Sequence, residues 1–93
     1  MYYVVRYVPH PTGFSRVGEV YPAHRAFVDA EGAAGRVWLI GTFSTAATDG
    51  AMCVFRTRVH AERFLAADPF VLEQVVVPSA VLEWEPLEFA PVP

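Results

Sequence analysis

The clearest guide to the architecture is "VHAERFLAADPF", residues 59–70, which lies between strand-like runs of the chain. Residues at positions i, i+3, i+4 and i+7 of this stretch fall on one face of a helix. Those positions hold Ala61, Phe64, Leu65 and Asp68. The face is thus apolar except at its last position. Proline directly after the aspartate disfavours helical backbone angles there, so we expect the helix to end at residue 68.

The runs on both sides of this helix have strand-like composition. "YYVVRYV" is β-branched and aromatic, while "RVWLIGTFS" and "AMCVFRT" predict a hairpin across a turn at Asp49 and Gly50. Pro22 suits the first position of an earlier helix, and Gly35 suits its end. The predicted elements are a strand at 2–8, a helix at 22–33, strands at 36–44 and 51–57, a helix at 59–68 and a strand at 80–89.

This order, β-α-β-β-α-β, predicts an α+β fold of the ferredoxin-like class: a four-stranded antiparallel sheet with two helices on one face. Ninety-three residues suffice for one hydrophobic core, so we expect a single domain over residues 1–93. The tail "APVP", residues 90–93, is expected to form an extended arm.

The predicted sheet carries more apolar surface than two helices on one face can cover. The chain is 54 % apolar and 14 % aromatic, with 18 % charged residues. Its first strand presents apolar side chains on both faces, so we expect a homodimer in which two sheets pack together. The two faces of that strand hold Tyr2, Val4 and Val8 on one side and Tyr3, Val5 and Tyr7 on the other.

Charge and composition argue against several classes of partner. The net charge is −3 and the seven basic residues, all arginines, are scattered, so we expect no binding to nucleic acid. No run approaches the roughly 18 apolar residues of a membrane span, and the N-terminus lacks the features of a signal peptide. Cys53 is the only cysteine, which excludes an internal disulfide. A cytoplasmic protein is the expectation.

Asp68 has two compatible interpretations. Aspartate before proline is a natural N-cap, so Asp68 can accept hydrogen bonds from a short turn that begins at Pro69. The same geometry also holds a carboxylate rigidly at the end of an apolar face, where it can accept a hydrogen bond from a catalytic partner. One oxygen can cap while the other faces a pocket.

His24 is the partner that the topology favours. In a split βαβ fold the two helices run antiparallel, so the first turn of one, where we place His24, lies near the end of the other. A histidine oriented by a carboxylate is a competent general acid or base. The alternative is a histidine at the edge of a helix face without any chemical role.

The remaining polar residues give weaker predictions. Arg6 interrupts an apolar strand and could hold a substrate anion, or pair with Glu83 or Glu85. Gly41 interrupts another strand, as a pocket wall requires, and Thr42 and Ser44 beside it could donate hydrogen bonds to a ligand.

No metal site is predicted from the remaining candidate ligands. His10, His60 and Cys53 show no metal-ligand spacing, and the cysteine suits a core position. The chain also has no glycine-rich phosphate loop. We therefore expect neither a metal nor a cofactor.

The apolar first strand and four short motifs together resemble the YCII-related (YciI-like) family. The motifs are "PAHRAFV" at 22–28, "GTF" at 41–43, "DG" at 49–50 and, most specific, "FLAADPF" at 64–70. The resemblance implies a dimeric α/β barrel, a group that includes muconolactone isomerase and small monooxygenases. It also implies an active site built on a His and Asp pair, here His24 and Asp68. Family members often have Gly-Pro where this chain has Gly41-Thr42, and the loop at 10–21 is individual to it.

The first functional hypothesis is a small cofactor-independent enzyme. His24 would act as general acid or base and Asp68 would orient it, in an isomerisation or elimination on a small cyclic or aromatic metabolite. Arg6 would hold the negative charge of that substrate. The alternative is a non-catalytic homodimer that binds a metabolite or a protein. A cofactorless oxygenase, suggested by fold analogy, ranks third.

Overall fold

The computed structural model describes residues 1–89, so the arm expected at 90–93 lies outside the described residues. The strands are β1 (Tyr2–Pro9), β2 (Leu39–Thr42), β3 (Ala51–Phe55), β4 (Val76–Pro78) and β5 (Leu82–Trp84). The helices are the 3₁₀ helix η1 (Gly13–Arg16), α1 (Val17–Ala33), α2 (Ala46–Asp49), α3 (Arg58–Ala67) and α4 (Pro69–Leu72). Within residues 1–89, no helix has the length and apolar character that a membrane crossing needs.

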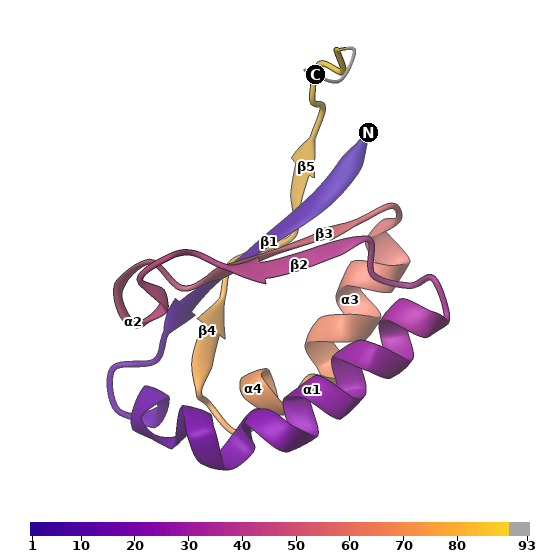
Figure 1. Cartoon of the computed structure of the whole chain (residues 1–93). Coiled ribbons are helices and arrows are strands. Elements are labelled where there is room, and N and C mark those ends of the chain that lie inside the picture. Colours follow the sequence, from indigo (N-terminus) through magenta and orange to yellow (C-terminus); the bar gives the residue numbers. More distant parts are fainter. Residues whose placement is uncertain (90–93) are drawn as a thin grey trace.

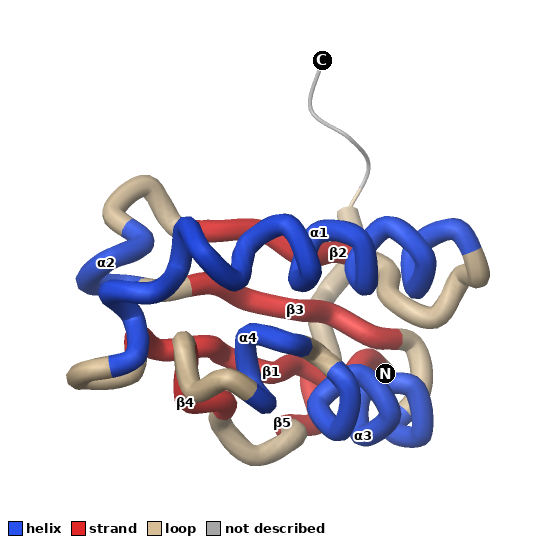
Figure 2. The backbone as a smooth tube through the Cα atoms, turned by 90° about the horizontal axis from the view of Figure 1, so that it is seen from below, coloured by secondary structure: helices blue, strands red, loops and turns tan. Residues whose placement is uncertain are grey.

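All strands belong to one antiparallel sheet in the order β2-β3-β1-β4, with β5 pairing the other half of β1. The helices α1, α3 and α4 lie on one side of this sheet (Figure 1). Figure 2 shows α1 over the β2 and β3 side, with α3 and α4 over the β1 side. This strand order with helices on one face is the ferredoxin-like arrangement, so the predicted fold class is confirmed.

The last strand is divided, and it begins earlier than predicted. The register against β1 shifts by one residue between β4 and β5. Ser79 lies at this bulge: its hydroxyl oxygen accepts the backbone N–H of Arg6 at 2.9 Å, and its own N–H donates to the carbonyl of Arg6 at 2.8 Å. The prediction of one strand at 80–89 was therefore wrong at both ends, because a bulge splits the pairing.

Helix α1 begins at Val17, five residues before the predicted start, and η1 precedes it directly. Much of the predicted loop at 10–21 is thus helical. Pro22 lies inside the helix, where it removes one intrahelical hydrogen bond to the carbonyl of Gly18. Gly18 is exposed, so water can satisfy this carbonyl. His24 consequently lies two turns inside α1, and its predicted place in the first turn was wrong.

The predicted hairpin of β2 and β3 is present, but both strands are shorter than predicted. Its connection contains the single turn α2 rather than a tight turn alone. Gly50 closes the connection with a φ of 73°, and a Cβ atom there would lie 1.8 Å from the carbonyl oxygen of Tyr7. Glycine is required at this position because the connection crosses β1 closely. Ser44 lies beyond the end of β2.

Helices of the described chain pack on only one of the two faces of the sheet. The face toward the helices forms the core, whose fully buried side chains include Val5, Tyr7, Cys53, Phe55, Ala61 and Phe64. The opposite face has no helix from the described chain over it, and it keeps large apolar side chains exposed. They include Val8, Leu39, Phe43, Val77, Leu82 and Trp84. The alternation predicted for the first strand thus holds at Val5, Tyr7 and Val8.

Candidate active site

Asp68 lies at the junction of two helices and is fully buried. It ends α3 with an extended backbone (φ −65°, ψ 121°), and its Oδ1 accepts the backbone N–H of Phe70 at 3.1 Å as the N-cap of α4. Pro69 occupies the first position of α4, where its missing N–H leaves no donor unsatisfied. The capping interpretation of this motif is therefore correct.

The same oxygen of Asp68 also contacts a histidine. Nδ1 of His24 lies 2.7 Å from Oδ1, and the His24 ring stacks on the Phe70 ring with centroids 3.8 Å apart and planes within 4°. The antiparallel arrangement of the two helix segments brings this pair together, as the sequence predicted. The imidazole is thus fixed at one ring nitrogen and along one ring face.

A third donor comes from the sheet. The hydroxyl of Tyr7, on β1, donates to Oδ2 of Asp68 at 2.6 Å in the buried core. Burial, followed by the charges of Cys53 and Asp68, raises the pKa of the Tyr7 phenol well above its ordinary value. The phenol therefore keeps its proton and acts as a donor. Sequence reasoning placed Tyr7 on one face of the first strand but did not pair it with Asp68, because alternation along a strand does not identify the partner of a side chain.

These contacts determine which ring nitrogen of His24 is available to a ligand. An ionised Asp68 accepts a hydrogen bond from Nδ1–H, so in the neutral ring Nε2 carries the lone pair. Nε2 has no hydrogen-bond partner among residues 1–89, yet no buried side-chain nitrogen or oxygen of these residues lacks a partner. Nε2 therefore keeps some accessible surface, and His24 is one of the residues that line a cavity.

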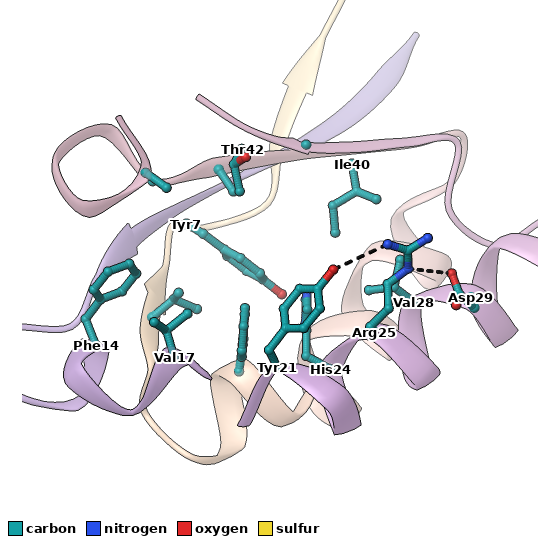
Figure 3. Close-up of a pocket in the computed structure, with 16 residues that line it drawn as sticks. Tyr7, Phe14, Val17, Tyr21, His24, Arg25, Val28, Asp29, Ile40 and Thr42 are labelled. Atoms are coloured by element: carbon teal, nitrogen blue, oxygen red, sulfur yellow. Dashed lines mark hydrogen bonds and ion pairs between the residues drawn. The ribbon is translucent and has the colours of Figure 1, made fainter. Parts of the chain in front are cut away.

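That cavity has a volume of about 430 Å³ and lies between α1 and the β2 side of the sheet (Figure 3). Its walls are mainly apolar, and its size suits a small-molecule ligand. The apolar lining includes Phe14, Val17, Val28, Ile40, Phe70 and Val76, and the polar lining includes Tyr21, Arg25, Asp29 and Thr42.

The structure brings only part of the predicted site to this cavity. Gly41 and Thr42 line it with His24. Arg6 is exposed on the opposite face of the sheet, where its guanidinium lies 5.4 Å from the centre of the Phe43 ring. Ser44 does not line the cavity either. Arg6 alternates with the buried Val5 and Tyr7, and that alternation turns it away from the helices.

Three polar residues of the cavity were missed: Tyr21, Arg25 and Asp29, all on α1. Tyr21, Arg25 and Asp29 follow one another at four-residue intervals, which is the spacing of one helix face. A helix predicted from residue 22 could not include Tyr21 on that face. Starting the helix before Pro22 would have revealed the pattern.

The other candidate ligands have structural roles. Nδ1 of His10 accepts the backbone N–H of Gly13 at 3.0 Å within a turn. Burial, and then the charge of Asp68, raises the pKa of the Cys53 thiol to about 12, so this thiol is a poor nucleophile. In the part of the chain that the structure describes, no group of three His, Cys, Asp or Glu side chains is arranged to hold a metal ion.

A second buried carboxylate, Glu31, lies near the end of α1. One of its oxygens pairs with Nε of Arg36, and the other lies 3.2 Å from Nε of Arg63 on α3. Glu31 does not line the cavity. These pairs tie the end of α1 to α3.

Comparison with known proteins supports the fold assignment. No family model and no curated protein matches the chain. A solved structure of similar fold is 5-chloro-2-hydroxyhydroquinone dehydrochlorinase (TftG) from Burkholderia phenoliruptrix, in complex with 2,5-dihydroxybenzoquinone. The TM-score is 0.70 at 17 % sequence identity, and the match covers 91 % of this chain and 94 % of that one. At this identity the likeness shows the shared fold.

Proposed function

We propose that the protein is a small acid–base enzyme in which His24 is the catalytic base and Asp68 orients it. One observation carries the proposal: a buried carboxylate fixes Nδ1 of His24, while Nε2 has no partner within residues 1–89 and the residue lines a cavity of about 430 Å³. A histidine whose tautomer is fixed in this way presents its lone pair to a ligand. Neither a metal nor a cofactor is part of the proposal.

The chemistry that suits this arrangement is proton abstraction beside a carbonyl or enol. Nε2 takes a proton from carbon, and the electrons of that bond form a new double bond. In an elimination they expel a leaving group from the neighbouring carbon, whereas in an isomerisation the imidazolium returns the proton to another carbon. Asp68 stabilises the imidazolium, while Tyr7 and the backbone of Phe70 hold Asp68 in place.

A planar oxygenated ring is the substrate class that we assign first. The cavity is lined mainly by apolar side chains, and Gly41 leaves room along one wall. A dehydrochlorinase that binds 2,5-dihydroxybenzoquinone has the same fold over 91 % of this chain. Loss of hydrogen chloride from a chlorinated ring requires a base and no redox step. The shared fold and the sequence motifs support membership of the YCII-related family. A cytoplasmic location remains a prediction from the sequence.

Turnover by matched histidine variants tests the proposal. With 5-chloro-2-hydroxyhydroquinone and related chlorinated hydroquinones as substrates, chloride release should need His24 and not His60, which lies at the start of α3. We expect His24→Ala to lose the activity and His60→Ala to retain it. Equal rates for both variants on a substrate that the wild type converts would refute the assignment of the base.

The homodimer is also part of the proposal. The uncovered sheet face with its exposed apolar side chains supports face-to-face packing of two copies. Equilibrium sedimentation should give twice the chain mass of 10.3 kDa. Leu39→Glu on this face should yield monomers, while Val59→Glu at an exposed position of α3 should not. A monomeric wild type at micromolar concentration would contradict the dimer.

A non-catalytic binding module is the second candidate, and the capping role of Asp68 favours it. If the pair is only structural, removal of the His24 ring should lower the free energy of unfolding by about 1 to 3 kcal/mol. A catalytic histidine can be removed at little cost or even with a gain in stability. Urea unfolding of His24→Ala separates the two.

A further inference from the structure

A charged group stands at the mouth of the His24 cavity. Tyr21, Arg25 and Asp29 follow one another at intervals of four residues on α1, and all three line the cavity (Figure 3). Nε of Arg25 donates to Oδ1 of Asp29 at 2.8 Å, and Nη1 donates to the Tyr21 hydroxyl at 3.3 Å. Arg25 is the only arginine among the lining residues.

The guanidinium of Arg25 has donors to spare. Its Nη2 makes no hydrogen bond within residues 1–89, so one edge of the guanidinium is available to a ligand. Hydrogen bonds to Asp29 and then Tyr21 raise its pKa, and the group is positively charged at any ordinary pH. A planar fork of donors suits an ionised oxygen better than a neutral one.

The present partner of Arg25 can be replaced. The side chains of Arg25 and Asp29 are 60 % and 62 % exposed. An ion pair this exposed contributes little to stability, since water screens both charges. A ligand anion that reaches Arg25 therefore competes with an exposed partner rather than with a buried one.

Arg25 and the catalytic base border the same space from adjacent positions of α1. The side chain of His24 is 11 % exposed and bonds to Asp68, whereas the side chain of Arg25 is largely solvent-accessible. A ligand in the cavity thus meets a nearly buried base and an exposed cation, among lining residues that are mainly apolar. The positive charge of Arg25 at the exposed part of the lining favours a ring that carries its negative charge on one side.

We propose that Arg25 anchors an ionised oxygen of the substrate, so that the enzyme selects planar rings bearing a carboxylate or an acidic hydroxyl over neutral rings. This inference rests on the proposed function, because it takes the His24 cavity as the substrate site. Arg25 sets specificity in it and takes no part in the proton transfer.

Binding of matched probes tests the inference. Benzoate and its neutral analogue benzamide form one pair, and 4-nitrophenolate and nitrobenzene form the other. Each would be titrated into the protein while the His24 ring signals are followed by NMR. We expect each anion to bind about tenfold more tightly than its neutral analogue, the usual gain from a charged hydrogen bond. If only one pair shows this preference, it identifies the carboxylate or the phenolate as the anion that Arg25 accepts.

Two variants of the ion pair should act in opposite directions. Arg25→Gln should remove the preference for the anion and leave the binding of benzamide unchanged. Asp29→Asn removes the competing carboxylate and should strengthen anion binding. Arg58→Gln is the control, because Arg58 is an exposed arginine paired with Glu83 that does not line the cavity. This control should match the wild type.

The results separate the two proposals. Equal binding of anions and neutral analogues, or a preference that survives in Arg25→Gln, overturns the role of Arg25 and leaves the base untouched. Absence of any His24 response to all four probes also overturns it, because this class of ring then does not enter the cavity. Failure of the base itself is detected separately, by turnover in His24→Ala.

Discussion

Asp68 and Glu31 are the two buried carboxylates within residues 1–89, 0 % and 2 % exposed, and they are held in different ways. Glu31 is paired with two arginines, whose charge does not change at ordinary pH. Asp68 accepts from a backbone N–H, a phenol and a histidine that can gain or lose a proton. Burial and pairing are common to both, so they do not identify a site. What identifies Asp68 as part of a candidate site is its titratable partner, His24, which lines a cavity.

The largest expected difference between the two carboxylates is in turnover. On a substrate that the wild type converts, His24→Ala should lower kcat by roughly a hundredfold to ten thousandfold, the usual contribution of a general base. Arg36→Ala removes a partner of Glu31 and should leave kcat unchanged, since Glu31 does not line the cavity. Steady-state kinetics on both variants provide the comparison. A comparable loss in Arg36→Ala would erase the distinction.

Alkaline pH should lower the free energy of unfolding, because Cys53 and Tyr7 in the core near Asp68 have raised pKa values. The pKa of Cys53 is raised from an ordinary 9.0 to about 12, so the unfolded chain releases this proton first. The stability linked to Cys53 is thus complete below pH 9 and is lost as the pH rises toward 12, by about 1.4 kcal/mol per pH unit. Tyr7, whose pKa is also raised, adds to the loss above pH 10.

Urea unfolding under reducing conditions at a series of alkaline pH values measures this loss. Cys53→Ala should show a shallower decline above pH 9, because its share of the linkage is removed. Arg36→Ala, at the other carboxylate, should keep the decline of the wild type. Parallel curves for wild type and Cys53→Ala would show that the thiol does not contribute.

The sequence predicts the Asp68 site better than its surroundings, for physical reasons. Helical spacing and the following proline were enough to locate Asp68, and topology then brought His24 to it. Tyr7 could not be found, because alternation along a strand tells which face a side chain takes and not which atom it meets. Tyr21 was missed because Pro22 resembles a helix start, while the exposed Gly18 lets the helix begin earlier. Arg25 lies inside the predicted helix, but helical spacing alone does not show that it lines a cavity. Glu31 gave no signal in the sequence.

A smaller effect is expected when Asp68 loses one neutral donor. Tyr7→Phe leaves Oδ2 of Asp68 buried without its hydrogen bond, so the free energy of unfolding should fall by about 1 to 3 kcal/mol. Tyr2→Phe is the matched control, because the Tyr2 hydroxyl bonds to Glu88 in an exposed position. We expect a change below about 0.5 kcal/mol for that control. Equal changes in urea unfolding would show that burial of the Asp68 site adds nothing.

The same substitution should also affect catalysis, which sets Asp68 apart from a purely structural carboxylate. Without the Tyr7 hydroxyl, Oδ1 of Asp68 still accepts from Phe70 and His24, but Oδ2 is no longer held and the carboxylate can rotate. The neutral His24 ring should then populate both tautomers, which ring ¹⁵N shifts distinguish. A lowered kcat with an unchanged tautomer ratio would mean that Tyr7 acts by another route.

The smallest effect is expected at Glu31, the carboxylate that we interpret as purely structural. Glu31→Gln keeps the shape of the side chain but removes its charge, leaving Arg36 and Arg63, whose side chains are 33 % and 56 % exposed. Both arginines can turn to water, so we expect a loss of about 1 kcal/mol in urea unfolding and an unchanged kcat. High salt should shrink the difference from wild type, because it screens the same pairs. A fall in kcat would instead mean that the end of α1 positions His24, and the two carboxylates would then form one functional unit.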